Sequence, residues 1–152
     1  MIHLSRLKVL LTALVISLCA SASASEVVVV VSAKSQVMAL NPNQISDIFL
    51  GKTNTFPNGG QAVPIDLTEG TPARDEFYAK LTGKSAAQIK AHWSKIIFTG
   101  RGLPPKEVLN GNSVKIRLAE NPNAISYIDQ SLVDGSVRIL YTPENPNRLR
   151  GY

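Results

Sequence analysis

The residues with the clearest capacity for chemistry lie between Asp66 and Tyr78, where a β-like run turns through Gly70 and a helix begins. Thr71 suits the N-cap position, and Pro72 suits the first helical position because its missing N–H would have no partner there. Free amides and the positive end of the helix dipole favour an anion at such a terminus. This turn is therefore a candidate anion site, although the local residues alone favour an ordinary capped βα turn.

A second candidate is Arg101, which stands between two glycines in the basic segment Thr99–Lys106. A long guanidinium on a flexible loop can reach a bound anion and hold it through two parallel hydrogen bonds. The alternative is a solvated loop charge, which the local composition favours. Both candidates concern binding of a small anion.

Catalysis is not indicated, and we assign no catalytic residue. His92 stands in the middle of a predicted helix, and no G-x-S-x-G pattern supplies a nucleophile for it. Asp75 and Glu76 are adjacent on a predicted helix, so their carboxylates do not face a common site. With one histidine outside the leader, the sequence predicts no metal site and no cofactor.

The N-terminus has the pattern of a cleaved secretory signal peptide, predicted over residues 1–24. Arg6 and Lys8 precede an apolar run, Val9–Leu18, that is too short to span a bilayer. Two overlapping A-x-A patterns follow within residues 20–24, and we expect cleavage beyond Cys19, leaving a periplasmic chain without cysteine. Losing two of 16 basic residues against 11 acidic ones leaves a net charge of 14 − 11 = +3, which is too weakly basic for nucleic-acid binding.

Strands alternate with helices over the rest of the chain, which predicts an α/β fold: a single three-layer lobe with a mostly parallel sheet. The run of five valines at 27–31 predicts a strand buried on both faces, typical of a parallel sheet. The predicted strands are Glu26–Ser32, Gln61–Leu67, Ala124–Ile128 and Val137–Tyr141. Helices are predicted from Asn41-Pro42 to Gly51, from Pro72 to about Thr82, after a cap at Ser85, and after a cap at Asn112 or Ser113. Residues 142–152 are predicted to form a flexible tail.

The predicted core is formed by apolar side chains that recur at helical spacing. We interpret Trp93 as one of them rather than as a platform for a ligand. The set is Ile45, Ile48, Phe49, Phe77, Leu81, Ile89, Trp93 and Ile97.

Several motifs resemble, in order, those of the substrate-binding proteins of phosphate ABC transporters, within the periplasmic binding protein type 2 family. The resemblance covers roughly Val27 to Tyr141 and implies a domain of that family at 25–141. The matching residues are Val27–Val31, Leu40, Gln44–Lys52, Glu69–Thr71, Arg74–Asp75, Phe77 and Asn121–Ile128.

The resemblance implies a solute-binding protein, and it also shows departures. Family members have two lobes around the phosphate, whereas this chain has the length of one. The family's Ser-Gly-Thr-Arg-Asp turn appears here with Glu69 in place of serine and with two residues between Thr71 and Arg74. A carboxylate repels phosphate, and Pro72 removes one amide donor. Gly70, Thr71 and Arg74 match residues of the family's turn, so the resemblance implies that they are ligands. Glu69 is not carried over as a ligand, because its carboxylate would repel phosphate.

Two functions remain open at this point. The first is binding of phosphate or a similar oxyanion, linked to ABC transport, with an inner-membrane transporter or an envelope protein as the candidate partner. The alternative is an accessory or interaction module of the cell envelope that has lost ligand binding. Nucleic acid is not an expected partner, and the pairing of two copies to rebuild a cleft is left open.

Overall fold

The computed structural model describes residues 26–143, so the predicted signal peptide and nearly all of the predicted tail lie outside the described residues. Five strands form one sheet with the order β3-β2-β4-β1-β5. The elements in chain order are β1 (Val27–Ser32), α1 (Pro42–Phe49), β2 (Val63–Leu67), α2 (Pro72–Thr82), α3 (Ala86–Phe98), β3 (Lys106–Val108), α4 (Gly111–Glu120), β4 (Ala124–Asp129), the 3-10 turn η1 (Gln130–Leu132) and β5 (Val137–Tyr141).

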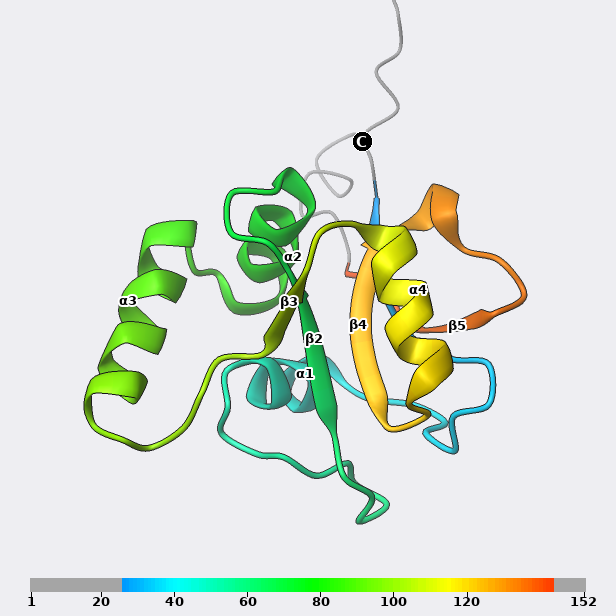
Figure 1. The fold of residues 1–152 in the computed structure, drawn as a ribbon, viewed down its shortest axis with the longest axis horizontal. Helices are drawn as coiled ribbons and strands as arrows, with labels where there is room; N and C mark the ends of the chain where they lie inside the picture. The colour runs from blue at the N-terminus through cyan, green and yellow to red at the C-terminus, as the bar shows by residue number, and fades with distance from the viewer. Residues whose placement is uncertain (1–25, 144–152) are drawn as a thin grey trace, which may run out of the picture.

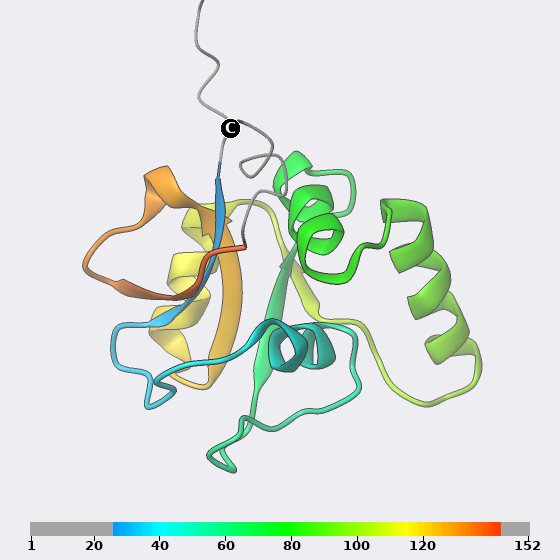
Figure 2. The same ribbon diagram turned by 180° about the vertical axis from the view of Figure 1, so that it is seen from behind.

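The predicted α/β class and three-layer arrangement are confirmed. Helix α4 covers one face of the sheet, and α1 and α2 cover the other, as the two opposite views show (Figures 1 and 2). Helix α3 packs beside α2 and extends away from the sheet. Within residues 26–143, no helix combines the length and the apolar character needed to cross a membrane.

The valine strand β1 is buried on both faces, as predicted, but its neighbours are not parallel to it. It pairs antiparallel with β4 on one side and with β5 on the other. Strand β2 is parallel to β3 and to β4, so β1 runs opposite to the four other strands. Burial on both faces follows from the helical layers above and below the sheet, which cover a strand whatever its direction.

Two helices begin and end where their local signals place them. Asn41 and Gln44 form a reciprocal capping box at α1, and Gly51 follows that helix with a positive φ of 71°. Ser85 and Gln88 form the same box at α3. The side chain of Asn110 accepts a hydrogen bond from the Ser113 amide, so the N-cap of α4 lies two residues before Asn112 and three before Ser113, the two predicted caps. Strand β3 lies where we predicted only a loop.

Six of the eight predicted core residues are buried, and the aromatic ones form a connected cluster. Phe77 is fully buried; its ring stacks on Tyr127 at 3.9 Å between centroids and meets Phe49 edge-on at 4.8 Å. Leu81 is only half-buried, at the margin of this core. The prediction for Ile97 is wrong: the residue is 50% exposed, on a helix that packs beside α2 and stands apart from the sheet along its whole length.

Candidate functional site

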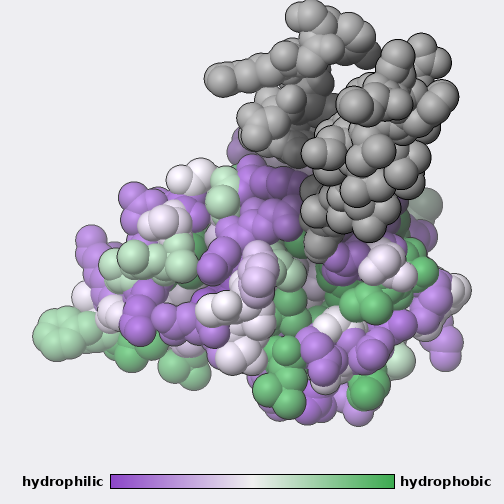
Figure 3. Space-filling model, turned by 90° about the horizontal axis from the view of Figure 1, so that it is seen from above, coloured by the Kyte–Doolittle hydropathy of each residue, from purple (hydrophilic) through white to green (hydrophobic). Residues whose placement is uncertain are grey.

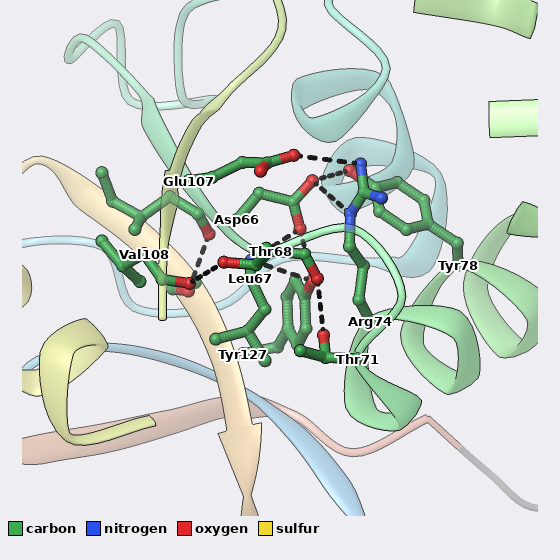
Figure 4. A network of polar contacts seen from close by, with 11 residues as sticks. Asp66, Leu67, Thr68, Thr71, Arg74, Tyr78, Glu107, Val108 and Tyr127 are labelled. Atoms are coloured by element: carbon green, nitrogen blue, oxygen red, sulfur yellow. Dashed lines mark hydrogen bonds and ion pairs between the residues drawn. The ribbon is translucent and has the colours of Figure 1, made fainter. Parts of the chain in front are cut away.

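A buried carboxylate organises the edge of the sheet at which the parallel strands end. Asp66 lies near the end of β2 and is 1% exposed. Its Oδ1 accepts hydrogen bonds from the Tyr127 hydroxyl and, at 2.9 Å, from the Leu67 amide. Its Oδ2 accepts from the Tyr78 hydroxyl at 2.7 Å and from Arg74 Nε at 3.2 Å (Figure 4). A buried charge needs such a set of donors, because an unpaired carboxylate would be strongly destabilising.

Three elements supply these donors, and the helical period explains two of them. Arg74 and Tyr78 are four residues apart in α2, so both side chains face the end of β2. Tyr127 comes from β4, the neighbour of β2 in the sheet. The Phe77–Tyr127 stack fixes the ring whose hydroxyl reaches Asp66. The site is therefore continuous with the aromatic core.

The charges of the cluster are set by burial and by Asp66. Burial and the neighbouring Asp66 carboxylate both raise the pKa of Tyr78 and of Tyr127, so both hydroxyls remain protonated donors. Burial lowers the pKa of Arg74, but the charge and hydrogen bond of Asp66 more than offset this, and the net shift is upward. The cluster thus contains the Arg74–Asp66 ion pair together with two neutral phenols.

Arg74 keeps hydrogen-bonding capacity beyond Asp66. Its Nε–H is used by Asp66, whereas neither Nη group has a hydrogen bond to another residue in the described part of the chain. Nη2 lies 3.7 Å from Glu107 Oε1, which is an ion pair rather than a hydrogen bond. The guanidinium carbon also lies 5.5 Å from the centre of the Tyr78 ring. Arg74 is thus held in place through one nitrogen and can donate from the other two.

The first turn of α2 offers fewer donors than the sequence suggested. Thr71 is the N-cap residue but makes no capping bond, because its hydroxyl donates to the Thr68 carbonyl at 2.9 Å. The Arg74 amide donates to the Thr71 carbonyl, and Pro72 has no N–H. Gly70 is exposed, with a φ of 88°. These residues lie beside Arg74, so the structure brings together three of the four predicted ligands.

Arg101 does not join them. Strands β2 and β3 are parallel, so the loop that carries Arg101 enters β3 at one edge of the sheet while Gly70 and Thr71 leave β2 at the other. Both views of the ribbon show this separation (Figures 1 and 2). Glu69, which we excluded as a ligand, forms an exposed ion pair with Lys90 at 3.1 Å. The predicted site is therefore split between two edges.

Asp66, Tyr127 and Glu107 are the residues that the sequence interpretation missed. An aspartate within the apolar strand pattern of β2 was the available signal for Asp66, because a buried carboxylate must have partners. Tyr78 was not among the predicted ligands either, yet its hydroxyl belongs to the cluster. Among residues 26–143, no group of three histidine, cysteine, aspartate or glutamate side chains could hold a metal.

Comparison with known proteins supports the fold. No protein-family model and no curated protein matches the chain. Among solved structures, it is similar to a putative phosphate ABC transporter substrate-binding protein from Clostridium perfringens, solved with bound phosphate: TM-score 0.62, 21% identity, over 82% of this chain and 49% of that one. It is also similar to an ABC-type phosphate transport receptor from Vibrio cholerae, with a TM-score of 0.60 and 17% identity, over 80% of this chain and 49% of that one. The chain thus spans about half the length of these structures and shares the fold of that half.

Proposed function

We propose that this chain is a phosphate-binding-protein-like lobe that binds a small oxyanion such as phosphate, without catalysis, where β2 ends and α2 begins. The chain has the fold of about half of a putative phosphate ABC transporter substrate-binding protein and of about half of an ABC-type phosphate transport receptor. Arg74 and the partly exposed first turn of α2 lie at the same edge of the sheet, and the positive end of the helix dipole there favours an anion. Gly70 and Thr71 are the proposed contacts beside it.

The observation that carries the proposal is the orientation of Arg74. Asp66 fixes the guanidinium through Nε and leaves both Nη groups without a hydrogen bond among the described residues. A planar guanidinium held in this way can donate two parallel hydrogen bonds to an oxyanion with little loss of side-chain entropy. Glu107 is the competitor for these donors, and at 43% side-chain exposure it can turn into solvent.

The expected affinity is modest. Each charge-assisted hydrogen bond contributes roughly 1.5–3 kcal/mol at best. Two carboxylates, Asp66 and Glu107, already face Arg74, and binding also costs the freedom of the ligand. We therefore expect micromolar to millimolar binding that weakens as salt rises.

Calorimetric titration with phosphate tests the proposal through substitutions with opposite effects. Glu107→Gln removes the competing carboxylate and is expected to tighten binding several-fold; Glu69→Ser is expected to act in the same direction. Arg74→Lys keeps a cation beside Asp66 but loses the planar pair of donors, so binding is expected to weaken several-fold. Loss of folding cannot produce both effects.

The matched control is Arg101→Gln, which removes one positive charge at the opposite edge of the sheet. Its phosphate affinity is expected to equal that of the wild type within twofold. A several-fold loss would instead support the earlier expectation that Arg101 is a ligand. Absence of phosphate binding in both the wild type and Glu107→Gln would overturn the proposal.

We also propose that the protein is exported and works in the periplasm, with an inner-membrane transporter or an envelope protein as its partner. The support is the leader pattern and the A-x-A sites of the sequence. Mass spectrometry of the protein from a periplasmic fraction is expected to show a mature N-terminus between Ser23 and Glu26. An intact N-terminus in the cytoplasm, or a lipid on Cys19, would contradict it.

A second candidate function is an accessory module of the cell envelope that keeps the lobe without binding a ligand. The observation that favours it is the enclosure of Arg74, which is 7% exposed and lies between Asp66 and Glu107. An arginine that is already neutralised in this way serves to hold α2 on β2. The phosphate titration separates the two candidates directly.

A further inference from the structure

A pocket of about 620 Å³ lies at the edge of the sheet opposite to Asp66. The end of α1, the residues before β2, helix α3 and the loop before β3 form its walls. Its volume is in the range of small-molecule sites. Figure 3 looks down on the other edge, where hydrophobic and hydrophilic residues are interspersed on the coloured surface. The pocket is thus separate from the proposed oxyanion site.

One side of the pocket is apolar and built around the single tryptophan of the chain. Trp93, Ile48, Leu103 and Pro104 line it. The Trp93 ring lies against Gly51 so closely that a Cβ added there would be 2.7 Å from its Cη2. Leu103 is 81% exposed, so it is available to cover an apolar ligand. Such walls favour a ligand with an apolar body.

The polar side of the pocket is positive. Lys52 and Lys106 line it, and no acidic side chain is among its lining residues in the described chain. Lys52 pairs with Asp47 at 3.1 Å, but both side chains are exposed, so this pair is weak. This charge pattern favours an anionic group on the ligand.

One unsatisfied donor belongs to the same wall. The Nε1–H of Trp93 is the buried side-chain polar group that lacks a hydrogen-bond partner among residues 26–143. Indole N–H is a donor only, and leaving it unpaired is unfavourable. Two independent features of the lining, the apolar wall and the lysines, therefore point to the same ligand.

We propose that this pocket is a second binding site, which takes an amphipathic organic anion. The apolar body of the ligand lies against Trp93 and Leu103, and its anionic group lies toward Lys52 and Lys106. Inorganic phosphate has no apolar part, so it is not the ligand that these mixed walls favour. The site is thus independent of the oxyanion site at the other edge.

The test uses 4-phenylbutyrate as the probe and the indole N–H of Trp93 as the reporter, observed by NMR. With one tryptophan in the chain, the indole signal is unique. We expect a saturable shift of this signal. The Lys52→Gln/Lys106→Gln variant is expected to bind at least tenfold more weakly, whereas Lys34→Gln/Lys95→Gln, with the same loss of charge outside the pocket, is expected to bind within twofold of the wild type.

4-Phenylbutylamine, which has the same apolar body and the opposite charge, is expected to bind at least tenfold more weakly than the acid. Inorganic phosphate is expected to leave the indole signal in place. The proposal is overturned if 4-phenylbutyrate gives no saturable shift, if the amine binds equally well, or if the two double-lysine variants behave alike.

Discussion

Replacing Asp66 with alanine is expected to lower the free energy of unfolding by about 3–5 kcal/mol, which is typical when one partner of a buried ion pair is removed. The substitution leaves the Arg74 guanidinium buried without its carboxylate, and it deprives the Tyr78 and Tyr127 hydroxyls of their acceptor. Urea denaturation of the wild type and the variant measures the difference. The two are compared with the same slope of unfolding free energy against urea concentration.

Asp47→Ala is the matched control, because Asp47 also forms an ion pair with a basic side chain but on the surface. Its expected cost is below about 1 kcal/mol. The double variant Asp66→Ala/Arg74→Leu is expected to be more stable than Asp66→Ala alone, since it removes the uncompensated charge. If Asp66→Ala costs no more than Asp47→Ala, the cluster does not hold α2 on the sheet.

Replacing Phe77 with alanine is expected to cost about 3–5 kcal/mol in unfolding free energy. Phe77 is fully buried and contacts Phe49, Tyr78 and Tyr127, so the change opens a cavity at the centre of the aromatic cluster. Because the Tyr127 ring loses its stacking partner, the hydrogen bond from its hydroxyl to Asp66 is also held less firmly in place. Thermal and urea unfolding check this value.

Ile97→Ala provides the comparison, because Ile97 has the same predicted role in the sequence but is half-exposed in the structure. Its expected cost is within about 0.5 kcal/mol, as for most surface substitutions. A large loss for Ile97→Ala and a small one for Phe77→Ala would reverse the assignment of the α2 and α3 faces.

Helix positions could be predicted because their signals are local. The capping boxes at Asn41 and Ser85 involve residues three apart, and Gly51 follows α1 with its own positive φ. Each signal is complete within a few residues of the chain. Where the signal was weaker, as for the three-residue strand β3 after Pro105, a loop and a short strand have the same local pattern.

The direction of β1 could not be predicted, because apolar composition reports burial and not the orientation of the neighbouring strands. The cluster around Asp66 was missed for a related reason. Asp66 and Tyr127 are 61 residues apart, and only the pairing of β2 with β4 makes them neighbours. Likewise, the parallel register of β2 and β3, which separates Arg101 from Thr71, is a property of the folded sheet.

The central claim is that an oxyanion binds at the end of β2, and one NMR titration of the mature protein with phosphate tests it most directly. The account predicts saturable shifts of the Gly70 and Ala73 amides and of the Arg74 guanidinium signal, with the Trp93 indole unchanged. Both amides lie at the turn into α2, and no residue in the described range accepts a hydrogen bond from either. Shifts confined to other parts of the chain, or no saturable shift while the protein remains folded, would contradict it.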